Sequence, residues 1–349
     1  MHRLHAIEVA RGIASGWVLL FHSLAALPAD SLHPVLQMAQ RFTSLGWLGV
    51  HIFFAISGWC IAERLAAAYR RGESCRGFLR ERVLRIFPTY WAAFALLLLT
   101  RLVAMPFNHT PPERNFPVSG TVWIGDLLLI NPYLGVPATL MVSWSLVFEL
   151  GFYALGAGAL LLRRHGLASA VIAALGMFLC AGPLLHVESK ATYVLGLWPD
   201  FFAGALVWWS ARVPTAKRTV AGIAGLSILL VLALTWPGGY GGLARTTALA
   251  TAAALWLASR HNRSGINGNL SRALAWLGVC SYSLYLVHLT VLSPFLNLAQ
   301  RAVPPSNAAF VVVWLAALAL GVGAGWLLHR FVESPVELWR KSRWSHRRI

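Results

Sequence analysis

The sequence predicts an all-α, polytopic membrane protein: a bundle of about ten transmembrane helices with both termini in the cytoplasm. Of the 349 residues, 58% are hydrophobic and only 12% are charged, whereas a soluble protein carries roughly 25% charged residues. Apolar stretches of about 20 residues, the length that crosses a bilayer, recur along the chain. Most of the 29 lysine and arginine residues fall in alternate connections between these stretches, as orientation signals do.

The apolar stretches predict the individual helices. The ten predicted spans are 6–27, 45–66, 86–105, 141–162, 167–186, 193–211, 216–236, 241–259, 273–296 and 308–330. The stretch 121–135 is too short and too interrupted to cross, so it is interpreted as a re-entrant or interfacial piece. Pro335 is expected to end the last helix. One transmembrane domain, with a core of about 5–337 and a basic cytoplasmic tail over 338–349, accounts for the chain.

The composition also limits the partners. A formal net charge of +17 suggests nucleic acid at first sight, but the basic residues lie between membrane spans, so membrane lipids are the expected partners and nucleic acid is not. The four cysteines have no metal-ligand or disulfide-framework spacing, and no metal is expected.

The strongest pointer to a functional site is a stripe of ionisable residues in the first span. Glu8, Arg11 and His22 lie there, and the separation of Arg11 and His22 amounts to three helical turns plus about 20°. Ionisable side chains at membrane depth are costly and persist mainly where they pair or line a cavity. A neutral histidine can act as general base on an alcohol. The structural alternative is an interhelical hydrogen bond for His22, with Arg11 extending to the membrane surface.

A basic connection leads into the third span. Arg82 and Arg85 are i,i+3 neighbours there, and guanidinium groups bind phosphate in a bidentate way. The alternative is that these arginines orient the chain, with Tyr90 and Trp91 in an interfacial aromatic belt. In the second span, Ser57 and the following glycine form a small step that permits close helix packing.

Three further segments place polar groups inside apolar spans. Glu149 follows Trp144 and Ser145 and precedes Tyr153; a buried carboxylate here is expected to pair with a basic group or to accept hydrogen bonds from substrate hydroxyls. His51 is a second buried ionisable candidate. The ninth span carries a polar stripe that is interpreted either as interhelical hydrogen bonding or as part of a substrate site: Tyr282, Tyr285 and His288.

Five segments, in this order, resemble the acyltransferase-3 family of integral membrane O-acyltransferases. Residues 11–22 resemble its Arg-x10-His segment, 53–58 its FFxxSG segment, 82–91 its RxxRIxPxYW segment, 144–153 its WSLxxExxFY segment and 281–288 its SYxxYLxH segment. The resemblance extends over about 5–337. Two positions depart from it: Glu8 stands where Asp is common, and His51 replaces an Asp.

The resemblance implies transfer of an acyl group, most simply acetyl, from cytoplasmic acyl-CoA to a hydroxyl of a sugar or of a cell-surface polysaccharide or glycolipid. Acetyl-CoA would be a cosubstrate, with no permanently bound cofactor, and the protein would lie in the cytoplasmic (inner) membrane. The expected catalytic residues are His22 as general base with Arg11, Glu8 and Glu149. The expected donor contacts are Arg82, Arg85, Ser57, Tyr90 and Trp91, and the expected substrate-site residues are His51, Trp144, Ser145, Tyr153, Tyr282, Tyr285 and His288.

A transporter or flippase of a sugar-linked lipid is the alternative function, because buried His, Arg and Glu also suit a proton relay. Transporters often carry a broken helix in each half, and the sequence shows no clear pair of breaks. A scaffolding or sensory role explains none of the buried charges.

Overall fold

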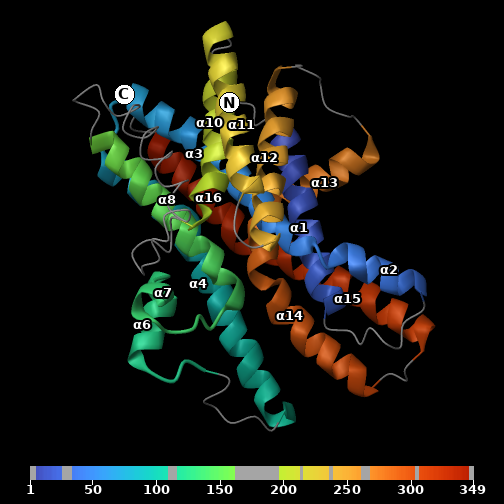
Figure 1. Ribbon diagram of the computed structural model, residues 1–349. Helices are drawn as coiled ribbons and strands as arrows, with labels where there is room; N and C mark the ends of the chain where they lie inside the picture. Colours follow the sequence, from blue (N-terminus) through green and yellow to red (C-terminus); the bar gives the residue numbers. More distant parts are fainter. Residues whose placement is uncertain are drawn as a thin grey trace. The chain divides into compact units, whose positions relative to one another are not determined.

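The computed structural model describes residues 5–25, 34–108, 116–161, 196–212, 215–235, 239–260, 268–302 and 306–345. Within these ranges all regular elements are helices (Figure 1), which confirms the all-α prediction. In chain order they are α1 (His5–Ala25), α2 (Pro34–Thr43), η2 (Gly46–Leu48), α3 (Gly49–Arg70), α4 (Cys75–Asn108), α6 (Gly120–Leu128), α7 (Asn131–Leu134), η3 (Met141–Ser143), α8 (Trp144–Leu161), α10 (Trp198–Arg212), α11 (Ala216–Leu234), α12 (Gly239–Arg260), α13 (Asn269–Val279), α14 (Ser281–Ala302), α15 (Asn307–Leu328), η7 (His329–Glu333) and α16 (Ser334–Ser345).

Several of these helices are suited to a bilayer. In the described part of the chain, six stretches are long and apolar enough to cross a membrane: Gln37–Arg70, Cys75–Pro106, Met141–Leu161, Ala216–Leu234, Ser281–Ala302 and Ala308–Ser342. Each overlaps one predicted span. Helices α1, α10 and α12 occupy three other predicted spans but are not among the six, and the predicted span 167–186 lies outside the described residues. The full count of ten stays a prediction.

Two details of the predicted helices differ from the structure. The predicted span 273–296 is divided: α13 ends at Val279, and the Cys280 carbonyl accepts a hydrogen bond of 2.9 Å from the Leu284 amide, so a new helix starts there. Pro335 does not end the last helix but occupies the second position of α16. The π-helix η7 directly precedes it, so the helical path continues from α15 through η7 into α16.

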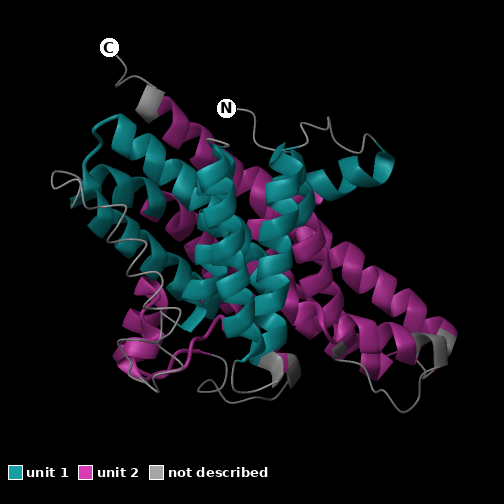
Figure 2. Cartoon of the chain, turned by 45° about the horizontal axis from the view of Figure 1, so that its top comes forward, with its two compact units in different colours: residues 1–11, 50–82, 144–275 teal, residues 12–49, 83–143, 276–349 magenta. Residues whose placement is uncertain are grey.

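The chain forms two compact units, drawn in teal and magenta in Figure 2. Unit 1 comprises residues 1–11, 50–82 and 144–275, and unit 2 comprises residues 12–49, 83–143 and 276–349. Helices α1, α4 and α13 contribute residues to both. Each unit is described by itself.

Unit 1 contains a close crossing of α3 and α10. A Cβ atom on Gly58 would lie 1.9 Å from the Phe201 carbonyl oxygen, and one on Gly204 would lie 1.8 Å from the Ala55 carbonyl oxygen. Any larger side chain at either glycine would therefore separate the two backbones. The crossing confirms the interpretation of the Ser57-Gly58 step as a site of close helix packing. Helix α10 also contacts α11 and α12.

Unit 2 has its apolar core among α1, α14 and α15. Leu19 and Leu24 from α1 meet Leu284 and Leu292 from α14 and Ala317 from α15. This packing brings together the two helices that carry His22 and His288.

The stretch predicted to be re-entrant forms the short helices α6 and α7 in unit 2. The Tyr90 hydroxyl donates to the Asp126 carbonyl at 2.7 Å, and Trp91 Nε1 donates to the Leu127 carbonyl at 3.0 Å. At 1.5 Å per residue, these contacts lie about 25 Å along α4 from its end at Asn108. The chain therefore folds back beside α4, and the interpretation of this stretch as a re-entrant or interfacial piece stays a prediction.

Candidate functional site

Two histidines from opposite ends of the sequence meet in unit 2. His22 lies in the last turn of α1, and His288 lies in α14. His288 Nε2 is 3.1 Å from His22 Nδ1, and the ring centroids are 4.9 Å apart. His288 is 1% exposed and His22 is partly buried. The sequence named both residues but gave no indication that they form a pair.

The hydrogen bonds of this pair fix which nitrogen carries the proton. His288 Nδ1 lies 2.8 Å from the Tyr285 carbonyl and 3.1 Å from the Leu284 carbonyl. A carbonyl only accepts, so His288 Nδ1 must donate, which leaves Nε2 of the neutral ring as an acceptor. His22 Nδ1 also faces a carbonyl, that of Val18, at 3.0 Å. His22 Nδ1 therefore carries a hydrogen shared between Val18 and His288, and His22 Nε2 carries the lone pair.

This arrangement suits a general base. The lone pair on His22 Nε2 can accept a proton from an alcohol. The hydrogen bonds to Nδ1 hold the ring and stabilise one tautomer, as an orienting partner does in hydrolase triads. His288 Nε2 is the side-chain acceptor for the hydrogen on His22 Nδ1.

The two tyrosines of the same helix make backbone contacts. The Tyr282 hydroxyl donates to the Ile86 carbonyl at 2.9 Å, and the Tyr285 hydroxyl donates to the Val142 carbonyl at 3.0 Å. These bonds fasten α14 to α4 and to η3. The structure therefore supports the interpretation of interhelical hydrogen bonding for Tyr282 and Tyr285. Their hydroxyls bond to backbone carbonyls, whereas His288 pairs with His22.

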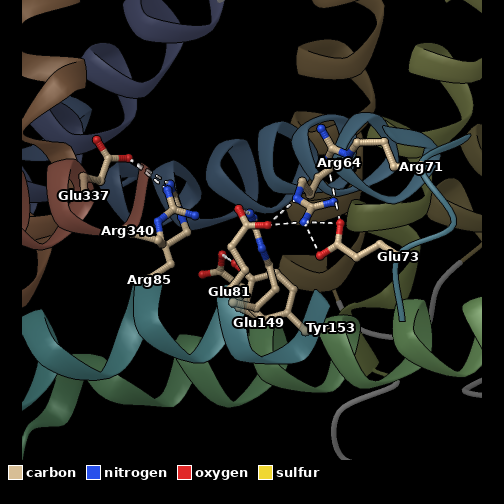
Figure 3. A network of polar contacts seen from close by, with 10 residues as sticks. Arg64, Arg71, Glu73, Glu81, Arg85, Glu149, Tyr153, Glu337 and Arg340 are labelled. Carbon is tan, nitrogen blue, oxygen red and sulfur yellow. Dashed lines mark hydrogen bonds and ion pairs between the residues drawn. The ribbon is translucent and has the colours of Figure 1, made fainter. Parts of the chain in front are cut away.

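In unit 1, arginines and glutamates form a network near the turn between α3 and α4 (Figure 3). Arg64 donates to Glu73 at 2.8 Å and to Glu81 at 2.5 Å. Arg82 donates to Glu81 at 2.6 Å and is 9% exposed. Arg71 lies 3.7 Å from Glu73. Each carboxylate of this part of the network thus contacts two guanidinium groups, and Arg64 is shared by both carboxylates.

The predicted carboxylate of α8 lies close to the same arginine. Glu149 accepts a hydrogen bond from the Tyr153 hydroxyl, and the Arg82 guanidinium lies 5.6 Å from the centre of the Tyr153 ring. Glu149 and His22 fall in different units, so the predicted role of Glu149 in orienting His22 stays a prediction.

Arg85, the second predicted phosphate ligand, lies in unit 2. It is 3.6 Å from Glu337, which also lies 3.5 Å from Arg340 (Figure 3). Tyr90 and Trp91 hold the end of α6, as described above. Donor binding by these residues stays a prediction, and in this structure each already has a protein partner.

His51 has a carboxylate partner that the sequence analysis missed. Its Nδ1 lies 2.5 Å from Asp200 Oδ2, and the two residues are 6% and 1% exposed. Asp200 lies in the first turn of α10. The missed signal was an acidic residue inside an apolar stretch, the same signal that identified Glu149.

The other predicted residues occupy positions without a resolved role. Glu8 and Arg11 lie partly buried on α1, Ser57 is partly buried on α3, and Trp144 and Ser145 begin α8. Among the described residues, no cluster of three or more His, Cys, Asp or Glu side chains is arranged to hold a metal ion.

Comparison with known proteins gives the family. The acyltransferase-3 family (Acyltransferase domain) matches residues 4–330. The exopolysaccharide production protein ExoZ of Rhizobium meliloti is 26% identical over 316 residues, covering 84% of this chain and 85% of ExoZ. Acyltransferase MdmB of Streptomyces mycarofaciens is 27% identical over 341 residues, covering 84% of this chain and 82% of MdmB.

A third relative is longer. The peptidoglycan O-acetyltransferase OatA of Listeria monocytogenes is 26% identical over 340 residues, which cover 83% of this chain and 51% of OatA. No solved structure matches the chain. The family match does not favour the transporter alternative. With its apolar helices and a match over nearly its whole length, the chain belongs to the acyltransferase-3 family and is a multi-pass membrane O-acyltransferase.

Proposed function

We propose that the protein moves an acyl group, most simply acetyl, from cytoplasmic acyl-CoA to a hydroxyl of a sugar or of a cell-surface polysaccharide or glycolipid. The observation that carries this proposal is the His22–His288 pair, which leaves a basic nitrogen on His22. The names of the relatives support the acceptor class, since ExoZ is an exopolysaccharide production protein and OatA a peptidoglycan O-acetyltransferase.

The chemistry needs one base and no redox partner. The acceptor hydroxyl oxygen attacks the thioester carbonyl carbon while His22 Nε2 takes the hydroxyl proton. The C–S bond then breaks, the proton passes from His22 to the thiolate, and the products are an ester and free CoA. Acetyl-CoA is a cosubstrate in this scheme, and no permanently bound cofactor or metal takes part.

The donor would enter at the basic turn between α3 and α4. Arg82 and Arg85 are the proposed phosphate ligands, with Ser57, Tyr90 and Trp91 near the path. Because Arg82 bonds to Glu81 and Arg85 lies beside Glu337, CoA phosphates would have to compete with these carboxylates. Exposed arginines of the same turn, Arg70, Arg76 and Arg80, would give the first attraction, and the same charges suit anionic lipid headgroups.

The proposed topology is ten helices in the cytoplasmic (inner) membrane with both termini in the cytoplasm. Reporter tags at residue 1, near residue 74 and at residue 349 should give cytoplasmic signals, and tags near 112 and 304 should give external signals. A cytoplasmic signal near 112 would contradict the ten-helix arrangement.

The direct test combines purified protein with cells. The full chain in detergent is supplied with acetyl-CoA carrying a labelled acetyl group, together with cell-surface polysaccharide from a strain that lacks the protein. We expect labelled acetyl esters on the polysaccharide and an equal amount of free CoA. Mass spectrometry of surface glycans from cells with and without the protein should show the same esters. Identical glycans in both strains, with no CoA release in vitro, would refute the proposal.

A further inference from the structure

A polar cavity in unit 2 lies apart from the histidine pair. Its volume is about 290 Å³. It lies between the C-terminal half of α4, the segment that leads into η3 and the middle of α14. Six polar side chains line it: Thr100, Arg101, Thr139, Thr290, Ser293 and Asn297. Polar side chains on helices of a membrane bundle are costly unless they pair or meet a ligand.

One of these side chains lacks a partner. Thr290 is 3% exposed, and its hydroxyl has no hydrogen-bond partner among the described residues. Thr100, on the opposite wall, differs because its hydroxyl donates to the Leu97 carbonyl of its own helix at 2.8 Å. A buried hydroxyl without a partner is destabilising, and a hydrogen bond from a ligand hydroxyl in the cavity would remove that cost.

The cavity lining also carries one positively charged side chain. Arg101 is the one charged side chain among the described residues that line it, and it donates to the Thr139 carbonyl at 3.2 Å. The nearby carboxylate of Asp126 accepts hydrogen bonds from Asn131, from the Thr139 amide and from the Thr139 hydroxyl. The cavity therefore offers hydroxyl and amide groups together with a guanidinium, a combination that suits a sugar with an anionic substituent.

Size and position restrict the ligand further. The volume lies just below the roughly 300–1,000 Å³ of small-molecule sites, so one monosaccharide unit is the appropriate occupant. Ser293 and Asn297 are exposed and form the rim. On α14, Ser293 follows His288 by five residues, about 140° around the helix. The cavity and the histidine pair therefore lie on different faces of a helix roughly 10 Å in diameter.

We propose that this cavity binds one acidic monosaccharide unit of an oligomeric acceptor, a unit other than the one that is acylated. The inference rests on the proposed function and makes it more specific: the acceptor is an acidic oligosaccharide or polysaccharide rather than a free sugar.

The test measures binding separately from catalysis. The probes are a glucuronate-containing tetrasaccharide and its carboxyl-reduced form, titrated calorimetrically into the purified full chain. The wild type should bind the acidic probe roughly tenfold more tightly, the scale of a hydrogen bond to a charged group. Arg101→Gln should remove this preference, and Thr290→Val should weaken binding of both probes about three- to tenfold. The matched control is Thr43→Val, since Thr43 is also buried but lies outside the cavity lining and donates to the Gln40 carbonyl of its own helix; it should bind both probes as the wild type does.

A second variant covers the case in which Arg101→Gln does not fold. Asn297→Asp adds a carboxylate at the exposed rim and should abolish the preference for the acidic probe by repulsion. Equal binding of both probes by the wild type, or a preference that persists in Asn297→Asp, would overturn the inference. Acyl transfer from acetyl-CoA is measured in parallel. If the protein transfers acetyl groups but does not show the expected binding of the two probes, only the assignment of the cavity is wrong. If it binds the probes as expected but transfers no acetyl group, only the proposed function is wrong.

Discussion

A cluster in unit 1 and a pair of histidines in unit 2 satisfy polar groups inside apolar helices in different ways. In unit 1, charges are paired: Arg64 and Arg82 bond to glutamates, and His51 bonds to Asp200. In unit 2, the hydrogen bonds of the histidine pair are those of two neutral imidazoles, and Nδ1 of each ring faces a backbone carbonyl. Nδ1 of His51 has a carboxylate as its partner, whereas Nδ1 of His22 faces a backbone carbonyl and a second imidazole.

We therefore predict different roles for two residues that look alike in the sequence. His22 and His51 are both histidines in apolar helices, but their partners differ. We predict that the His51–Asp200 pair, which lies near the crossing of α3 and α10, mainly stabilises the fold, and that His22 acts as the base. Substitutions in each unit test this contrast.

The largest effect should come from His22→Ala. Loss of a general base lowers turnover by roughly 10²–10⁴-fold. Initial rates of acetyl transfer to polysaccharide measure this effect. Acetyl-CoA affinity and the melting temperature in detergent should stay close to the wild-type values. Near-normal turnover would remove His22 from the mechanism and leave the pair as a helix contact.

The matching change in unit 1 is Asp200→Asn. It should lower the free energy of unfolding by about 1.5–3 kcal/mol, because the acceptor of the His51 hydrogen bond loses its charge, while turnover per folded molecule changes little. Denaturant unfolding in detergent and active-site-normalised rates separate the two quantities. A loss of turnover as large as that of His22→Ala, with unchanged stability, would show that unit 1 also holds catalytic groups.

His288→Leu tests the positioning role. Removing the acceptor for His22 Nδ1 leaves a donor less well satisfied, and we expect turnover to fall roughly 5- to 100-fold. His288→Gln places an amide oxygen in the same region and should recover part of the loss. A purely structural role for His288 predicts that both variants lose stability and that neither changes turnover per folded molecule.

The smallest effect concerns the donor. If phosphate competes with Glu81 for Arg82, Arg82→Ala should weaken acetyl-CoA binding by about tenfold, and Glu81→Gln should strengthen it by a few-fold. Arg82→Lys should recover only part, since an ammonium lacks the bidentate fork. Calorimetric titration with acetyl-CoA at two salt concentrations measures these effects. Unchanged affinity in all three variants would leave Arg82 as a structural residue of the network.

The sequence predicted those features of the structure that depend on residues close together in the chain. Apolar length predicted the six long stretches that the structure contains, and helical spacing placed Tyr282, Tyr285 and His288 on one helix. The small step at Ser57-Gly58 indicated a close crossing because glycine permits it whatever the partner helix is.

The partners could not be predicted, because they depend on which helices become neighbours. Asp200 contacts His51 from 149 positions away, and His288 contacts His22 from 266 positions away. Nothing in the spacing of a single sequence specifies such pairs. The carboxylate partners of Arg82 and Arg85 were missed for another reason: arginines in a basic connection suggest an external anion, although Glu81 and Glu337 lie within reach in the fold.

The crossing at Gly58 and Gly204 also has a consequence for biogenesis. Helix α3 is synthesised long before α10. The face of α3 that carries Gly58 and His51 therefore lacks its packing partner while α4 and α8 are synthesised. During this interval His51 lacks Asp200, and the crossing can form only after α10 has been made. Substitutions at either glycine should therefore reduce the amount of protein that escapes quality-control proteolysis, while the molecules that do assemble turn over at the normal rate.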